Sequence, residues 1–219
     1  SMFLILKPPA IKQLITPILV CLSGILLAQP AEVLTLNKPS LSRGKNIMEA
    51  LASRASATEF TSDELSLQDI SDLLWAANGI NRPEIGKKTA PSATNSQDID
   101  VYVVTSKGAY IYEPVQHQLK LVNAGDFREL VAGRQKNFAN APLFCIMVSD
   151  ISRFRGNDDS QKMRWAAMDA AIVSQNINIF CSGVGLRTRT RAFMEADKLR
   201  EALKLTPSQF PMLNNPVSN

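Results

Sequence analysis

One segment near the middle of the chain combines residue types that suit the binding of a flat heteroaromatic ring. It begins at residue 89 and reads Thr-Ala-Pro-Ser-Ala-Thr-Asn-Ser-Gln-Asp-Ile-Asp-Val-Tyr-Val-Val. The short side chains of Pro91, Ser92 and Ala93 leave backbone amides open to a ligand, and the carboxamides of Asn95 and Gln97 offer donors and acceptors. Pro, Ser and Asn also favour turns in any protein, so the same residues fit an ordinary strand entry with Asn95 in an Asx-turn.

Histidine and cysteine usage argues against two common kinds of site. His117 is the single histidine and lies in a Val-Gln-His-Gln-Leu hairpin turn, where we expect a solvated residue and not a catalytic base. The three cysteines, Cys21, Cys145 and Cys181, lie too far apart to form a structural zinc site. Cys145 and Cys181 each stand in an apolar run, so we expect buried free thiols.

The charge distribution argues against a nucleic-acid partner. The chain of 219 residues has a net charge of +4, and its only concentrated cationic cluster is Arg187, Arg189 and Arg191. A nucleic-acid surface needs a broader basic face with interleaved aromatic residues. Because these arginines occupy every second position, an extended segment would place them on one side, where a solvated face is the simplest interpretation.

Residues 31–219 predict a single α+β domain, and a 45% hydrophobic composition supplies its core. An antiparallel-dominated central sheet is expected, flanked by helices, with one long helix that is apolar around most of its circumference and therefore buried in the core or in an oligomer interface. An extended arm covers 31–44, and an irregular loop covers 80–98. Helices are expected at 45–54, 62–78, 125–132, 160–181 and 196–203, and strands at 100–105, 109–112, 118–122, 142–148 and 209–213.

Residues 1–30 predict a signal peptide. Lys7 and Lys12 precede an apolar run from residue 14 to 28, which is too short to span a membrane comfortably, and small or polar residues follow it near Ala28. We therefore expect an exported protein, periplasmic or secreted, without a stable membrane span in its mature form. The alternative is an N-terminal helix that is buried or packed on a partner, in which case the protein is cytoplasmic. Cys21 is a candidate for lipid attachment, although Val20 before it suits that role poorly.

Several motifs in order resemble the flavin-dependent nitroreductase family, especially its branch related to thiazoline and oxazoline dehydrogenases. The resemblance covers residues 44–217. Its pieces are the Arg-Ala-Ser-Ala-Thr-Glu-Phe segment from Arg54, the helix end Leu-Leu-Trp-Ala-Ala-Asn-Gly-Ile-Asn-Arg from Leu73, the loop from residue 89, Gln175-Asn176, and Gly185-Leu186 before Arg191-Ala192.

The resemblance implies an FMN-binding homodimer with each flavin held between the two subunits. By this analogy Arg54 and Ser56 would hold the phosphate and the ribityl chain, because an arginine fork and a hydroxyl suit a dianionic phosphate. The backbone of 91–93 and the Asn95 carboxamide would meet the edge of the isoalloxazine ring, so we expect this corner to lie beside Arg54 and Ser56. Arg191 or its neighbouring amides would lie near the electron-accepting end of the ring. Arg54 is also compatible with a helix C-terminal cation, and Ser56 with an N-cap or loop hydroxyl.

Two departures from the family pattern concern the phosphate. Thr58 occupies the position of a second basic residue, and residues 216–219 read Pro-Val-Ser-Asn where the family has a Gly-Tyr-Pro-basic tail. Loss of two charge-assisted hydrogen bonds would weaken FMN binding by several kcal/mol, at about 1.5–3 kcal/mol each, unless Lys88, Arg187 or Arg189 compensates.

Three functions follow from the resemblance. The leading one is an FMN-dependent oxidoreductase that passes a hydride through flavin N5 from a donor such as NAD(P)H to a nitroaromatic, a quinone or a similar small acceptor; in an exported protein the donor would differ. The second is a non-catalytic homodimer that binds a flavin or another ligand. The third is a dehydrogenase of peptide-derived azolines, which needs a partner cyclase.

Overall fold

A computed structural model describes residues 29–219, and the expected signal peptide lies almost wholly outside them. Its centre is a seven-stranded antiparallel sheet in the order β1-β6-β5-β4-β7-β9-β8. The strands are β1 (Val33–Thr35), β4 (Ile99–Thr105), β5 (Gly108–Glu113), β6 (Gln118–Ala124), β7 (Leu143–Asp150), β8 (Arg187–Thr188) and β9 (Gln209–Ser218). The helices are α1 (Ile47–Ser53), α2 (Leu67–Asn78), α3 (Arg128–Ala132), α4 (Asp159–Val184) and α5 (Ala196–Ala202).

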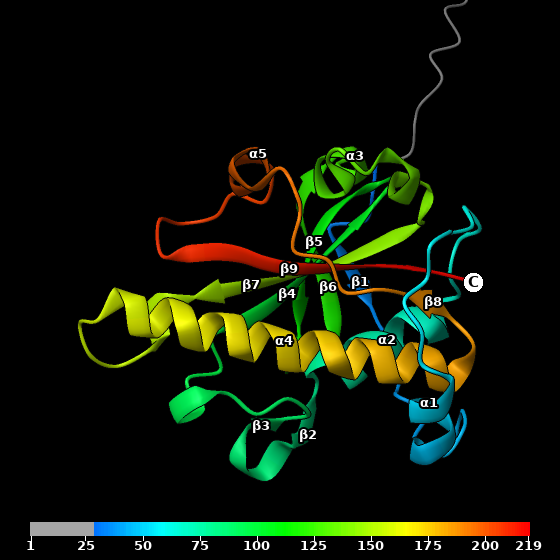
Figure 1. Cartoon of the computed structure of the whole chain (residues 1–219), viewed down its shortest axis with the longest axis horizontal. Coiled ribbons are helices and arrows are strands. Elements are labelled where there is room, and N and C mark those ends of the chain that lie inside the picture. Colours follow the sequence, from blue (N-terminus) through cyan, green and yellow to red (C-terminus); the bar gives the residue numbers. More distant parts are fainter. Residues whose placement is uncertain (1–28) are drawn as a thin grey trace, which may run out of the picture.

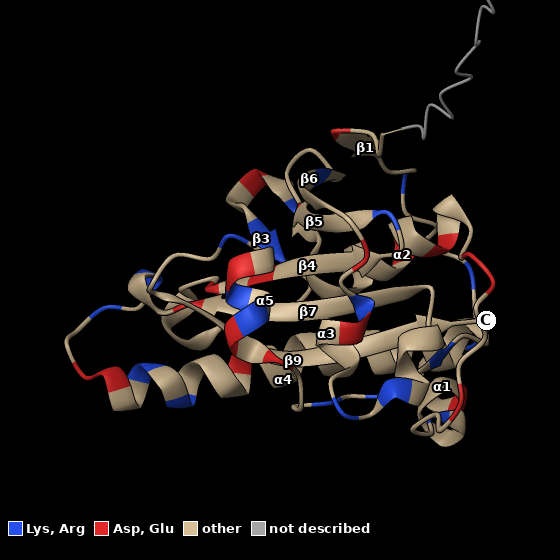
Figure 2. Ribbon diagram, turned by 90° about the horizontal axis from the view of Figure 1, so that it is seen from above, with Lys and Arg blue, Asp and Glu red and all other residues tan. Residues whose placement is uncertain are grey.

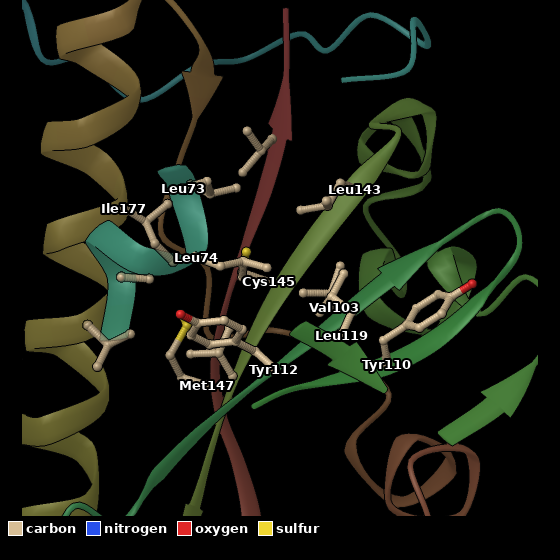
Figure 3. Packing of buried hydrophobic residues seen from close by; sticks show 14 of the residues in the cluster. Leu73, Leu74, Val103, Tyr110, Tyr112, Leu119, Leu143, Cys145, Met147 and Ile177 are labelled. Atoms are coloured by element: carbon tan, nitrogen blue, oxygen red, sulfur yellow. The ribbon is translucent and has the colours of Figure 1, made fainter. Parts of the chain in front are cut away.

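The helices form a layer on each face of the sheet (Figure 1). α1, α2 and α4 cover one face, and α3 and α5 cover the other. The core is split accordingly: Figure 3 shows Leu73 and Leu74 of α2 and Ile177 of α4 facing Cys145 and Met147 of β7. A second cluster on the other face joins the alternate residues of the same strands to α3 and α5. This arrangement confirms the predicted α+β fold with an antiparallel sheet and a long central helix.

The two longest apolar segments of the sequence form β7 and α4, the central strand and the central helix of the fold. Seven of the eight residues of β7 are buried, because β4 and β9 flank the strand and helices cover both of its faces. α4 has 26 residues; Asp158 caps its start by accepting from the Gln161 N–H, and Gly185 ends it in the left-handed conformation at φ 83°. Buried positions of α4 recur at helical spacing, at Ala166, Ala170, Val173, Ile177 and Cys181.

Three local predictions were wrong. α2 begins at residue 67, several residues later than expected, because Ser66 is the hydroxyl that caps it by accepting from the Asp69 N–H. The expected irregular loop at 80–98 starts with a small hairpin of β2 (Ile80–Arg82) and β3 (Lys87–Lys88). β9 continues to Ser218, twice the length expected, because the residues after Leu213 pair with β7 and β8.

Other predictions concern single residues. Cys145 and Cys181 are buried free thiols, as expected. His117 does lie in a turn, but it is half-buried, with Nδ1 bonded to the Tyr112 hydroxyl at 2.8 Å and Nε2 bonded to the Asn37 carbonyl oxygen at 2.9 Å.

Charges of both signs are interspersed over the molecule (Figure 2). No helix in residues 29–219 is long and apolar enough to cross a membrane.

Candidate functional site

The predicted ring-binding corner is a strained turn. Ala93–Asn95 form a short 3-10 turn, and three residues within and after it, Thr94, Asn95 and Gln97, have φ values of 53°, 55° and 49°. Left-handed backbone costs a residue other than glycine about 1–2 kcal/mol. Such strain persists only where surrounding contacts enforce it, and it concentrates at ligand sites.

The contacts that enforce this turn come from several elements. The Ala93 N–H donates to both carboxylate oxygens of Asp169 on α4, at 2.9 and 3.1 Å. The Gln97 N–H donates to the Ser92 hydroxyl at 2.8 Å, and Arg153 donates to the Gln97 carbonyl oxygen at 2.9 Å. Pro91 and Asn95 are exposed, and Ser92 and Ala93 are half-buried. The corner therefore presents a fixed backbone and an accessible carboxamide to solvent.

The second predicted group, Arg54, Ser56 and Thr58, follows α1. Arg54 is exposed and forms the C-cap of that helix. The segment is fixed to β8 by the Ala57 N–H, which donates to the Thr188 carbonyl oxygen at 2.9 Å. Ser56 and Thr58 line a cavity of about 430 Å³, and Arg54 stands outside its lining.

This cavity contains two cations at places the family pattern does not specify. Lys45 and Arg187 line it together with Glu59 and several hydroxyls. The Lys45 ammonium donates to the Ser53 hydroxyl at 3.2 Å, and its backbone N–H donates to the Gly183 carbonyl oxygen at 2.9 Å. Sequence reasoning missed Lys45, which precedes α1 without any motif. It named Arg187 as part of an arginine cluster with a solvated face and as a candidate compensating cation.

A glycine allows the approach that brings Lys45 to the cavity. Gly44 has φ 89°, and a Cβ on it would lie 3.1 Å from the Gly183 carbonyl oxygen at the end of α4. A larger residue would push the chain away from the helix end, and Lys45 with it. The partial negative charge of a helix C-terminus opposes a bound anion, so the two cations and the hydroxyls are the groups that make this cavity suitable for a phosphate.

Arg191 does not take the predicted place at a ring. Its side chain is 5% exposed, and all five of its N–H donors are bonded within the protein. The acceptors are the carbonyl oxygens of Val131 and Ala132 and the side-chain oxygens of Asn214 and Gln135. Its own amide donates to the Asn214 carbonyl oxygen. The guanidinium lies on the α3 face of the sheet, opposite α4, where burial lowers its pKa to about 10. It is a structural residue.

Nor do Lys88 and Arg189 compensate at the cavity. Arg189 donates to the Ala57 carbonyl oxygen at 3.2 Å and lies over the Phe138 ring at 5.2 Å. Lys88 belongs to β3, on the side of the ring-binding corner, where burial lowers its pKa. Among the three cations suggested by the sequence, Arg187 alone lines the cavity.

The two predicted groups do not meet within one chain. The corner is attached to Asp169, in the first half of α4, whereas the cavity includes Ser182, near its end. At 1.5 Å per residue these positions are about 20 Å apart along the helix. Figure 1 shows α1 beside the orange, C-terminal end of α4. Within one chain, the expectation that the corner lies beside Arg54 and Ser56 was wrong.

The fold and these motifs match known proteins. The sequence pattern of the Nitroreductase family matches residues 51–217, most of the chain. This chain belongs to the nitroreductase family.

Two relatives extend over most of this nitroreductase-family protein. MJ1384 of Methanocaldococcus jannaschii, whose name places it among the nitroreductases, is 29% identical over 178 residues, 77% of this chain and 88% of that protein. A crystal structure of a Ralstonia eutropha protein, also named as a nitroreductase, is 33% identical with a TM-score of 0.81 and covers 89% of this chain and 94% of that one.

A third similarity concerns the predicted branch of the family. A chain in the Escherichia coli microcin synthetase complex McbBCD has a TM-score of 0.69 and covers 84% of this chain and 77% of its own, at 17% identity. This nitroreductase-family protein therefore shares its fold with a chain of a microcin synthetase complex.

Proposed function

We propose that this protein is an FMN-dependent oxidoreductase that works as a homodimer. The family supports a flavin oxidoreductase of a general kind. The observation that carries the more specific proposal is the pair of separated half-sites: a cationic, hydroxyl-lined cavity at one end of α4 and a strained carboxamide corner near the other. A second copy of the chain can bring the cavity of one subunit to the corner of its partner.

The residues present fit FMN. In the cavity, Ser56 and Thr58 supply hydroxyl donors, whereas the Ser182 hydroxyl already donates to the Ala50 carbonyl oxygen at 2.7 Å. Lys45 and Arg187 supply the charge that Thr58 does not. Each charge-assisted hydrogen bond to a phosphate contributes about 1.5–3 kcal/mol. Arg54 is exposed beside the cavity and keeps its proposed role at the phosphate. At the corner, the backbone of 91–93 and the Asn95 carboxamide would hold the edge of the ring.

An apolar outer surface supports the dimer. Ile47, Met48 and Leu51 on α1 are exposed, as is Met168 on α4. α1 packs directly on α4, and two small residues, Ala167 and Ala171, are also exposed on the outer side of α4. Exposed apolar residues on adjoining elements are typical of an interface, and members of this family are typically dimers. We name Ile47, Met48, Leu51, Ala167, Met168 and Ala171 the outer face.

The chemistry would belong to the cofactor. When bound, FMN would accept a hydride at N5 from a reduced donor such as NAD(P)H and return it to a small organic acceptor. The side chains of this protein would bind and orient the ring and exclude water from it. Such chemistry does not need a catalytic histidine, and the single histidine of this chain, His117, is bonded to Tyr112 and to the Asn37 backbone. If residues 1–30 direct export, as we propose from their sequence, the donor would be another reductant.

The experiment is an anaerobic titration of the purified protein with FMN, followed by NADH or NADPH and then by an acceptor. We expect a yellow dimer that binds one FMN per chain, bleaches with the donor and regains colour with the acceptor. Failure to bind FMN would contradict the proposal.

The alternative is a dimer that binds the flavin without turnover. Thr58 favours it, because this position lacks the second cation of the family pattern. That alternative predicts bleaching by dithionite but by neither nicotinamide donor.

A further inference from the structure

Two buried carboxyl groups lie beneath the ring-binding corner, and the chemistry proposed above does not use them. Asp98 precedes β4 and is fully buried, and Asp169 on α4 is 3% exposed. The two side chains share a hydrogen bond. A carboxylate has no hydrogen to donate, so this bond exists only while one of the two groups holds a proton.

The position of Asp98 is fixed from both sides. The Ser149 hydroxyl on β7 donates to Oδ2 of Asp98, and the Ser96 hydroxyl donates to Oδ1 at 3.2 Å. The Asp98 carbonyl oxygen accepts from the backbone N–H of Asp150. Asp98 therefore cannot easily move away from Asp169.

Other charges near the pair come from three elements. Lys88 on β3 is half-buried and interacts electrostatically with Asp98. Asp100 on β4 pairs with Arg153 at 2.6 Å, and Arg153 also lies 3.6 Å from Asp150, at the end of β7. No ion pair to Asp98 or Asp169 occurs within residues 29–219. A proton bound by one of the two carboxyl groups is therefore what relieves the repulsion between them.

Asp169 connects this pair to the corner. Its two oxygens accept the Ala93 N–H, immediately before the left-handed residues Thr94 and Asn95. Asp98 follows Gln97, the third left-handed residue. The strained turn is thus fixed at its first residue by one carboxyl and at its end by the other.

We propose that the Asp98–Asp169 pair positions the 91–97 turn, and that one shared proton controls how firmly the turn is held. The proposal gives a new role to two residues of the proposed flavin site, and its effect on ligand binding rests on that function. Asp169 is a positioning residue, because it acts through the Ala93 amide.

The predicted pH range is close to neutral. Burial, and next the hydrogen bond with Asp98, raise the pKa of Asp169 to about 7. Below that pH the shared proton joins the two carboxyls and the turn is held. Above it, two carboxylates face each other in a buried space and repel. The Ala93 N–H on its own favours the ionised form of Asp169, but burial and Asp98 outweigh it in raising the pKa. Because Asp98 is held from both sides, we expect the repulsion to move Asp169 away from the Ala93 N–H.

The test is amide hydrogen exchange of the full-length protein without flavin, expressed as protection factors for residues 93–97 between pH 6 and 8.5. We expect wild-type protection to fall about tenfold across this range. Asp169→Asn keeps an oxygen for Ala93 and an N–H₂ group for Asp98, so it should keep the protection and lose the pH dependence. Asp169→Ala should lose protection at every pH. Asp159→Asn, at an exposed carboxylate of the same helix, is the matched control and should behave as wild type.

FMN affinity, measured by fluorescence over the same pH range, is a second readout. The ratio of the wild-type and Asp169→Asn dissociation constants should rise with pH, and taking this ratio removes the titration of the phosphate itself. Wild-type protection that does not change with pH, or a pH dependence that survives in Asp169→Asn, would overturn the proposal. If no variant binds FMN while exchange changes as expected, the proposed function fails and the proton-dependent turn stands.

Discussion

At the scale of single residues, we propose that Lys45 and Arg187 in the cavity replace the second basic residue of the family pattern, at whose position this chain has Thr58. We expect Lys45→Met and Arg187→Met each to weaken FMN binding about tenfold or more, because each removes a charge-assisted bond of about 1.5–3 kcal/mol. Isothermal titration calorimetry measures the change. Lys198→Met and Arg155→Met, at exposed positions outside the cavity, are the matched controls. Equal losses in the controls would show a general charge effect and contradict the assignment.

A variant at Arg191 should lower the stability of the fold without changing the affinity for FMN. Its guanidinium satisfies buried acceptors on the α3 face, at Val131, Ala132, Gln135 and Asn214. Arg191→Met leaves them without donors, at about 1–3 kcal/mol for each unsatisfied group. We expect the free energy of unfolding in urea to fall by about 3 kcal/mol or more. The FMN affinity of the folded fraction should not change, and a selective loss of affinity with normal stability would return Arg191 to the flavin site.

Asp169 should also make stability depend on pH. Its pKa is raised from 3.8 to about 7, so between these values the folded protein holds a proton that the unfolded chain has lost. The contribution is complete below about pH 4 and is lost as pH rises toward 7. Urea unfolding at pH 5 and pH 7.5 should show a larger fall in wild type than in Asp169→Asn. Identical falls in the two proteins would contradict the raised pKa.

At the scale of elements, a substitution on the outer face of α1 and α4 tests whether this surface forms the dimer interface. Met48 is 70% exposed, and a buried carboxylate without a partner at this position would disfavour dimerisation. We expect Met48→Asp to give a monomer by light scattering and to lose FMN binding at the same time, because each site needs both subunits. Val115→Asp, at an apolar residue that is 78% exposed in the β5–β6 turn, is the control and should remain a dimer. A monomeric Met48→Asp that still binds FMN would contradict the shared site.

At this scale, the elements whose sequence pattern arises from burial alone could be predicted. The apolar run of β7 and the helical spacing of α4 both arise from burial, and both elements lie within a few residues of their expected bounds. β9 was underestimated because its second half, after Leu213, owes its extended form to pairing with β7 and β8. In the structure the antiparallel pairing with β7 shifts register between Met147 and Val148, next to Pro211. Only the tertiary pairing reveals that the strand continues.

The site was predictable in its parts and not in its assembly. The corner was apparent from its small residues and carboxamide, and Ser56 from its motif. The partnership of Asp98 with Asp169, and of Lys45 with Arg187, depends on packing between segments far apart in the chain, which no local pattern records. Arg191 matched a motif, but the sequence could not show toward which face of the sheet its side chain turns.

At the scale of the whole molecule, the separation of the two half-sites along α4 is the central result. A helix of this length keeps the phosphate cavity and the ring-binding corner of one chain apart, so the account requires two chains for each flavin.

A mixed dimer tests it most directly. One chain carries Arg187→Glu, which reverses a charge in the cavity, and the other carries Asn95→Asp, which removes the carboxamide donors at the corner. Either variant alone spoils both sites of its homodimer. If each site takes its cavity from one chain and its corner from the other, the purified mixed dimer has one site with both defects and one intact site. We predict one FMN per two chains, bound with wild-type affinity. A mixed dimer that binds no FMN tightly would contradict the account, because it would place cavity and corner of the same chain in the same site.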